Sequence, residues 1–283
     1  MTTQPEAQQS SDAPPVRRPV RTDARETPPQ LHPPAPWAPF ARFVSVEVTR
    51  MASDPRFLVL ILGMPVGMYL LFTNLPGASQ STGGLAPRVG AMISMAAFGA
   101  IGTALTATAP RLAQERTTGW MRQLRVLPMP GHRVVAAKVL AAMIWALPAI
   151  VLVFAAAELD HGIRLAAWRW CAIAVLLWLG TAPFAALGLL IGYVTDESSA
   201  FAVMYGVYLF LGAAGGLWIP VSELPAVLQR IAHALPSNRD AELGWSVASA
   251  HGPSLAGAAI LVAWLAAFTG AVVLVYRRAA ATR

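Results

Sequence analysis

Six long apolar runs constrain this chain more than any other feature of its sequence. A helix rises 1.5 Å per residue, so about 20 apolar residues cross the roughly 30 Å hydrocarbon core of a bilayer. Each run therefore predicts one transmembrane helix. The predicted spans are residues 57–74, 89–109, 134–157, 170–194, 199–219 and 254–276.

The composition agrees with a membrane protein. The chain is 56% apolar and only 12% charged, with a mean hydropathy of +0.54, whereas soluble domains carry about 25% charged residues. We therefore predict an all-α membrane protein with six transmembrane helices. The net charge of +7 does not indicate a nucleic-acid partner, because the basic residues flank apolar runs and do not cluster on one soluble face.

The distribution of basic residues predicts the orientation in the membrane. If both termini lie on one side, most of the 21 Arg and Lys residues share that side, and the other side keeps Arg88, Arg164, Arg169, Arg230 and Arg239. Cytoplasmic segments carry the excess of Arg and Lys, which places both termini in the cytoplasm. Basic residues that are nearly all Arg suggest a GC-rich bacterial genome, and hence the plasma (cell inner) membrane of a bacterium.

Two segments precede the spanning domain, which we place at residues 54–283. Residues 1–36 are rich in Pro, Gln, Ser and Thr, which predicts a disordered cytosolic tail. This tail has no apolar centre of the kind that a secretory signal needs. Residues 37–53 predict an amphipathic helix lying in the membrane interface. Its apolar positions are Phe40, Phe43, Val44, Val48 and Met51, and its charged positions are Arg42, Glu47 and Arg50.

Little in the spans points to chemistry within the membrane. No ionisable residue lies near the centre of a predicted span, and Lys138 and Arg169, near span ends, are expected to extend toward the headgroups. A proton relay is therefore disfavoured. No paired Asp, no Ser/His set and no His/Glu cluster is found, so we predict neither catalysis nor a metal or cofactor site. Ion-coupled transport through backbone carbonyls stays open.

The chain also lacks a nucleotide-binding loop of the Walker type. Such a loop needs a Gly-rich turn followed by Lys and then Ser or Thr. Lys138 is the only Lys, and it stands between Ala137 and Val139. Any ATPase activity would therefore belong to a separate polypeptide.

The most informative segment is residues 110–133, which is polar and joins the second span to the third. Pro110 is expected to end the second span. Helical spacing then predicts a short amphipathic cytosolic helix that ends at Pro128 and Pro130. Its periodic positions are Leu112, Glu115, Gly119 or Trp120, Leu124 and Leu127. The residues alone also allow a plain connector whose Arg side chains contact lipid phosphates.

The pattern Glu115-Arg116-x-x-Gly119, followed by Leu124 and Pro128, resembles the cytosolic signature of the permease subunits of type-2 ABC exporters. Thr117 and Thr118 depart from it, because the family often has a charged or polar residue after Glu-Arg, and Met129 replaces a small aliphatic residue. A second stretch, Gly216-Leu217-Trp218-Ile219-Pro220, resembles the family's segment after the fifth span, where short helices lie at the outer face. Pro225 can begin such a helix, with an apolar edge formed by Leu224, Leu228, Ile231 and Leu235.

The resemblance implies an exporter built from two permease subunits, as a homodimer or a pair of different permeases, and two ATP-binding subunits. ATP and Mg would bind to the ATPase partner, and this chain would bind no cofactor. The residues that would contact the ATPase are Glu115, Arg116, Gly119, Trp120, Leu124 and Pro128. Asp196 and Glu197 form a possible second contact, or they only favour the start of the fifth span through its helix dipole.

The cargo implied by the family is an amphipathic drug, antibiotic or lipid-like molecule, which would connect the protein with antibiotic resistance. Two other functions stay open from the residues: a secondary or ion-coupled carrier, and a non-transporting membrane scaffold. Three glycine pairs with four-residue spacing predict close helix packing, either within one subunit or between subunits. They are Gly63 and Gly67, Gly188 and Gly192, and Gly212 and Gly216.

Overall fold

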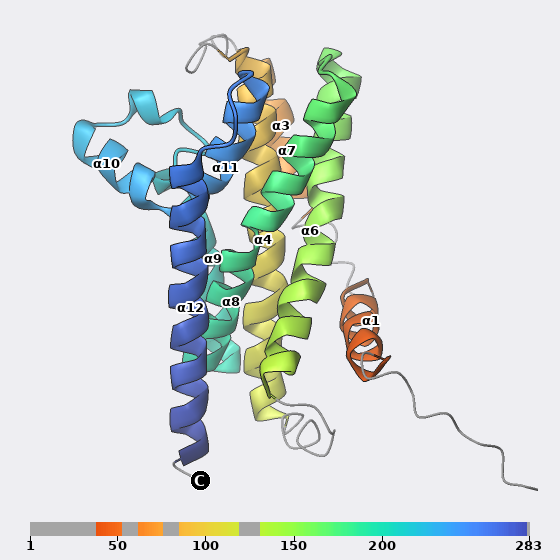
Figure 1. Ribbon diagram of the computed structural model, residues 1–283, viewed down its shortest axis with the longest axis vertical. Coiled ribbons are helices and arrows are strands. Elements are labelled where there is room, and N and C mark those ends of the chain that lie inside the picture. Colours follow the sequence, from red (N-terminus) through yellow and green to blue (C-terminus); the bar gives the residue numbers. More distant parts are fainter. Residues whose placement is uncertain (1–37, 53–61, 76–84, 119–130, 282–283) are drawn as a thin grey trace, which may run out of the picture. The chain divides into compact units, whose positions relative to one another are not determined.

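A computed structural model describes residues 38–52, 62–75, 85–118 and 131–281, and within these ranges the regular structure is helical. Figure 1 shows the long helices running side by side. They are α3 Gly63–Asn74, α4 Pro87–Thr117, α6 Gly131–His161, α7 Ala167–Gly180, α8 Ala182–Val194, α9 Glu197–Ala214 and α12 Leu255–Ala281. The other helices are α1 Ala38–Ala52, η2 Val221–Glu223, α10 Ala226–Ala234 and α11 Pro236–Ala248.

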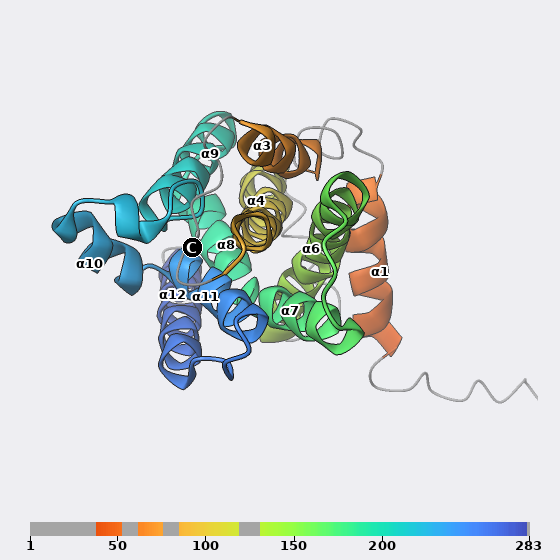
Figure 2. The same ribbon diagram turned by 90° about the horizontal axis from the view of Figure 1, so that it is seen from above.

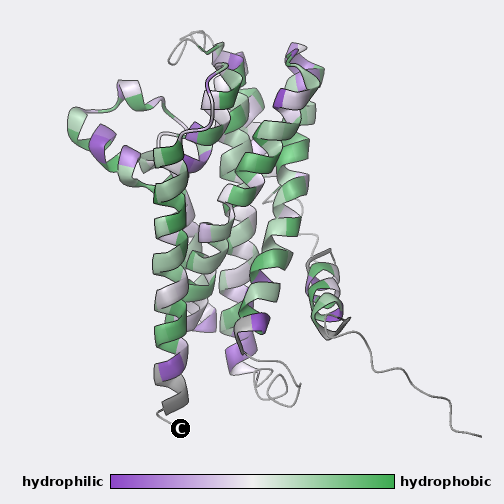
Figure 3. Ribbon diagram, viewed as in Figure 1, coloured by the Kyte–Doolittle hydropathy of each residue, from purple (hydrophilic) through white to green (hydrophobic). Residues whose placement is uncertain are grey.

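Five helical stretches in the described part of the chain are long and apolar enough to cross a membrane. They are Pro87–Thr117, Arg133–His161, Ala167–Val194, Glu197–Ala214 and Leu255–Arg277, and they match the second to sixth predicted spans. The first predicted span is described only from residue 62 onward, as α3. The expected tail, residues 1–36, lies outside the described residues. Figure 3 shows apolar residues along the middle of these helices and polar residues gathered at their ends.

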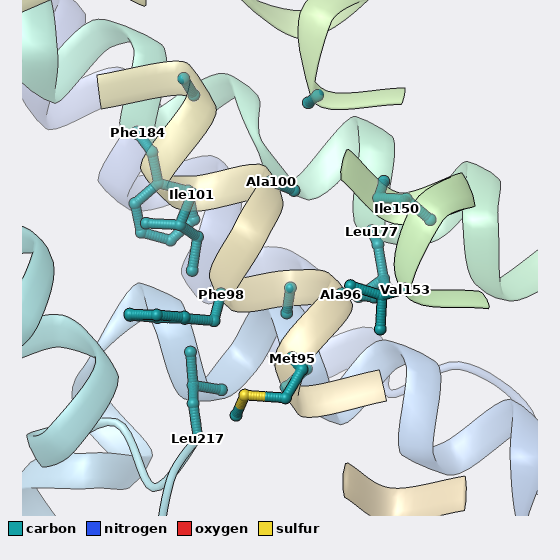
Figure 4. Packing of buried hydrophobic residues seen from close by; sticks show 14 of the residues in the cluster. Met95, Ala96, Phe98, Ala100, Ile101, Ile150, Val153, Leu177, Phe184 and Leu217 are labelled. Carbon is teal, nitrogen blue, oxygen red and sulfur yellow. The ribbon is translucent and has the colours of Figure 1, made fainter. Parts of the chain in front are cut away.

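Helix α4 lies at the centre of the bundle, surrounded by α3, α6, α7, α8, α9 and α11 (Figure 2). Because it is apolar on every side, it can pack against neighbours all round. Figure 4 shows Phe98 and Ile101 of α4 near Phe184 of α8, and Ala96 near Val153 of α6. Small side chains alternate with large ones along α4 and let the neighbouring helices pack close to it. Helix α4 is therefore held by several helices along its length.

Pro110 does not end the second span, as the sequence had suggested. Helix α4 continues through it to Thr117. A proline removes one backbone hydrogen bond, but membrane helices tolerate this where neighbouring helices hold the backbone. Here α8 approaches closely, since a Cβ atom added to Gly192 would lie 2.6 Å from the carbonyl oxygen of Ala109. The charged residues after Pro110 therefore extend the same rigid helix.

The glycine pairs behave differently from one another. Gly188 and Gly192 pack against α4 within the chain, and a Cβ atom at Gly188 would meet Thr108 Oγ1 at 1.9 Å. Around Gly63 and Gly67, no heavy atom lies within 4 Å of an added Cβ. Their face of α3 is thus open toward the rest of the described chain.

Short helices follow α9, as predicted, but the last of them is not a surface element. Helix α11 packs against α7, α12 and α4, and the side chains of its first turn are buried. Ser237 Oγ donates to Leu211 O at 2.8 Å, and Asn238 Nδ2 donates to Gly215 O at 3.0 Å. These bonds connect the first turn of α11 to backbone carbonyls at the C-terminal end of α9. Helix α11 is thereby tied into the bundle.

Candidate functional site

Three charged side chains meet at the end of α4, where the motif Glu115-Arg116 lies. Lys138 of α6 places its Nζ 2.8 Å from Glu47 Oε1 of α1, and 2.9 and 2.8 Å from Oε1 and Oε2 of Glu115. All three residues are buried, with exposed fractions of 4% for each Glu and 7% for Lys138. We call these residues the charge cluster. It joins α1, α4 and α6 at one point.

The burial of Lys138 corrects the expectation that it extends toward the headgroups. An ammonium group removed from water needs compensating charge, and here two carboxylates supply it. Glu47 was expected on the polar side of the interfacial helix, and this is also wrong. Phe43 and Val44 of α1 pack against Ala137 of α6, and this packing turns Glu47 inward, next to Lys138.

A second cation lies at the edge of the charge cluster. Arg50 Nη1 is 3.7 Å from Glu115 Oε1, and the Arg50 side chain is 47% exposed. Arg50 also accepts, through its carbonyl oxygen, a hydrogen bond of 3.5 Å from Arg111 Nη2. Two carboxylates therefore face two cations, which balances the local charge.

Arg116 points to a different side of α4 from Glu115. Its Nη1 donates to the carbonyl oxygens of Gly192, Tyr193 and Thr195 at 3.0, 2.6 and 3.2 Å. The last carbonyls of a helix have no partner in the helix, and the helix dipole favours a cation there. Arg116 thus caps the C-terminal end of α8.

The two threonines that depart from the family pattern also make contacts. Thr117 Oγ1 donates to Glu197 Oε2 at 2.5 Å, which links the end of α4 to the first turn of α9. Thr118 bonds back to Gln114 O through both its N–H and its Oγ1. Asp196 is exposed and its side chain makes no capping bond to α9.

The structure thus brings together part of the predicted contact set. Glu115, Arg116 and Glu197 are gathered around the end of α4. Gly119, Trp120, Leu124 and Pro128 lie outside the described residues. Whether this set contacts an ATPase stays a prediction.

Sequence reasoning missed Glu47, Arg50 and Lys138 as partners. One signal was available, because a lone Lys inside an apolar run requires a nearby carboxylate. The sequence does not say which carboxylate, since Glu47 is 91 positions away.

The arrangement is suited to mechanical work. Glu115 and Arg116, adjacent in sequence, contact different neighbours of α4. One ties α4 to α1 and α6, and the other ties α4 to α8. Among the residues placed by the structure, no group of His, Cys, Asp and Glu could hold a metal ion. Because of the contacts of Glu115 and Arg116, a displacement applied to the end of α4 would be passed to α1, α6 and α8.

Comparison with known proteins gives two similarities. The family model described as "ABC-2 type transporter" matches residues 40–238. The protein named "Putative transport permease YvfS" of Bacillus subtilis (strain 168) is 27% identical over 222 residues, which cover 78% of this chain and 90% of that protein. The family match includes Glu115 and Arg116 at the end of α4 and extends through α10.

Proposed function

The chain belongs to the ABC-2 type transporter family, and we propose that it is the permease subunit of an exporter driven by ATP that a separate subunit hydrolyses. It is a multi-pass membrane transport permease, and permeases of this family pair in general with an ATPase subunit. In the complex, two permeases, identical or different, would join two ATP-binding subunits that carry the ATP and Mg.

One observation supports this proposal most strongly. The adjacent residues Glu115 and Arg116 end a long central helix and connect it to α1, α6 and α8 through buried or carbonyl-capping bonds. A segment that only joined two spans would not need such connections. We infer that Glu115 acts by fixing the α4 end from inside, while the segment from Gly119 to Pro128 contacts the ATPase.

The proposed orientation follows from the distribution of basic residues. The charge cluster, the start of α6 and the C-terminus would face the bacterial cytoplasm, together with the N-terminal segment. The exit side would then be the opposite end of the bundle, at the start of α4 and the end of α11. An amphipathic drug-, antibiotic- or lipid-like cargo would pass between two permeases, and membrane lipid would surround them.

Co-purification with a candidate ATP-binding cassette ATPase, sought first among the neighbouring genes, tests the proposal. The wild-type permease should hold the ATPase through purification and stimulate ATP hydrolysis in liposomes. Gly119→Trp should abolish assembly by blocking close approach. Glu115→Ala should retain the ATPase but lose the stimulation, because the α4 end is no longer fixed.

Gln114→Ala is the matched control, since Gln114 is exposed and adjacent to Glu115. It should behave as wild type. Unchanged assembly and unchanged stimulated hydrolysis in both Gly119→Trp and Glu115→Ala would contradict the coupling role.

A second candidate, ion-coupled transport, is favoured by one buried carboxylate. Asp240 of α11 has no exposed surface, and neither carboxylate oxygen has a hydrogen-bond partner among the described residues. Ionisable groups of this kind mark ion or proton paths in transporters. Asp240→Asn distinguishes the candidates: it should abolish uptake driven by a proton gradient if ions drive transport, and leave ATP-driven transport intact if they do not.

A further inference from the structure

A cavity of about 600 Å³ lies at the end of the bundle away from the charge cluster. Its walls come from α3, the first turns of α4, the segment after α9, α10 and α11 (Figure 1). Pockets of about 300–1,000 Å³ hold drug-sized ligands. The cavity is therefore large enough for a small organic molecule.

The wall that follows α9 is held in place by a defined turn. Leu217 N–H bonds to Gly212 O at 3.0 Å and Gly216 N–H bonds to Ala213 O at 3.3 Å, with Gly216 at a φ of 74°. These two bonds form a Schellman motif, which ends a helix with a left-handed residue. A Cβ at Gly216 would also lie 2.3 Å from Val221 Cγ2. The turn directs residues 217–223 across the cavity.

Aromatic side chains line the cavity in fixed positions. Trp245 Nε1 donates to Gly90 O at 3.3 Å. Trp218 meets the ring of Phe98 edge-on, with centroids 5.4 Å apart, and its buried Nε1 has no acceptor among the residues that the structure describes. Phe72 of α3 contributes a third ring. Aromatic faces attract organic cations.

The charged groups of the lining are acidic. Glu223 and Glu242 line the cavity, and no Arg or Lys is found among the described residues of its lining. Glu242 is paired with Arg239, whereas Glu223 is exposed and has no ion-pair partner within the described ranges. His233 and His251 are the other titratable groups of the wall. One uncompensated carboxylate thus faces an aromatic, mostly apolar space.

We propose that this cavity binds an amphipathic organic cation, with Glu223 facing the positive charge and Trp218 and Trp245 contacting the apolar body. The inference rests on the proposed function, because it assigns a cargo class and a place at the exit side where cargo is held. An anionic ligand would meet the unpaired Glu223 carboxylate, while the Arg239 cation is already paired with Glu242, and such a ligand is therefore disfavoured.

Two probes of the same shape and opposite charge test the proposal. Tetraphenylphosphonium and tetraphenylborate are titrated into the purified permease in nanodiscs, with empty nanodiscs as the blank. The permease should bind the phosphonium, quench tryptophan fluorescence and bind the borate at least about tenfold more weakly. Equal binding of both probes, or no phosphonium binding above the blank, would overturn the proposal.

Variants locate the site. Glu223→Gln should weaken phosphonium binding about tenfold, and Trp218→Leu should weaken it several-fold. Glu158→Gln is the matched control. Glu158 is exposed near the C-terminal end of α6 and is not among the residues that line the cavity. If Glu223→Gln binds like Glu158→Gln, the assignment is wrong.

This outcome is separable from that of the ATPase experiment. The titration needs no ATPase, and Glu223 is remote from the α4 end. If the permease binds the phosphonium but no ATPase co-purifies with it, only the proposed function is contradicted. Lost phosphonium binding with intact ATPase coupling would contradict the cavity assignment alone.

Discussion

Two regions of this protein bury carboxylates, and they do so in opposite ways. In the charge cluster, Glu47 and Glu115 each lie within 2.9 Å of the Lys138 ammonium. In α11, Asp240 is fully buried beside Gly180, where an added Cβ would lie 1.9 Å from Asp240 Oδ1, and its oxygens find no described partner. Buried charge is stable only when it is paired or neutralised. The stability of the charge cluster therefore depends on its ion pairs, whereas the packing around Asp240 depends on the fit of its side chain against Gly180.

The comparison predicts the largest effect at Lys138. Lys138→Met leaves two buried carboxylates without their cation, which should lower the free energy of unfolding by about 3–5 kcal/mol. The apparent unfolding temperature in detergent measures the effect. Arg133→Met, an exposed change near the start of the same helix, is the control. Equal unfolding temperatures for the two variants would show that the charge cluster does not stabilise the fold.

A smaller effect is expected at Glu115. Glu115→Gln keeps the shape but leaves Lys138 with Glu47 alone, at a cost of about 1–3 kcal/mol. A double-mutant cycle checks the origin, because the change should cost less in a Lys138→Met background. Glu158→Gln serves again as the exposed acid-to-amide control. Costs that simply add would mean that Glu115 and Lys138 do not interact.

The link on the other side of α4 should be weaker. Arg116→Met removes the cap on the α8 carbonyls, and because solvent reaches this side chain we expect a loss of about 1 kcal/mol or less. The loss should be detectable as faster hydrogen exchange at the end of α8. Gln114→Met, on the same helix, should leave the exchange unchanged. Identical hydrogen exchange in both variants would show that Arg116 does not stabilise the C-terminal end of α8.

The smallest effect is expected at Asp240. Asp240→Asn removes no described ion pair or hydrogen bond, so stability at neutral pH should stay within about 1 kcal/mol of wild type or rise. The same acid-to-amide exchange at Glu115 should destabilise the protein, and the two melts are compared side by side. A loss at Asp240 as large as that at Glu115 would show that both carboxylates depend on partners.

Most of the membrane architecture was predictable from the sequence, because span length is a local property. The second to sixth spans, the helix at 38–52 and the short helices after α9 all follow from apolar runs, helical spacing and proline positions. The motif Glu115-Arg116-x-x-Gly119 also indicated the family that the comparison then showed. Local patterns of this kind need no knowledge of distant partners.

Predictions about side-chain partners were less successful. Pro110 was expected to end a helix, and it did not, because α8 packs against the backbone there. Lys138 was expected at the headgroups, and it is buried between two carboxylates. In each case a contact between distant segments decided the outcome.

The sequence by itself determined that this chain crosses a membrane and that polar residues are concentrated at the ends of its helices, because a bilayer selects for apolar length. The tertiary structure alone decided which charges meet. It brought Glu47 to Lys138 across 91 positions and directed Glu115 and Arg116 toward different neighbours of α4. A buried charge must be paired or neutralised, and where it is paired, only packing selects the partner.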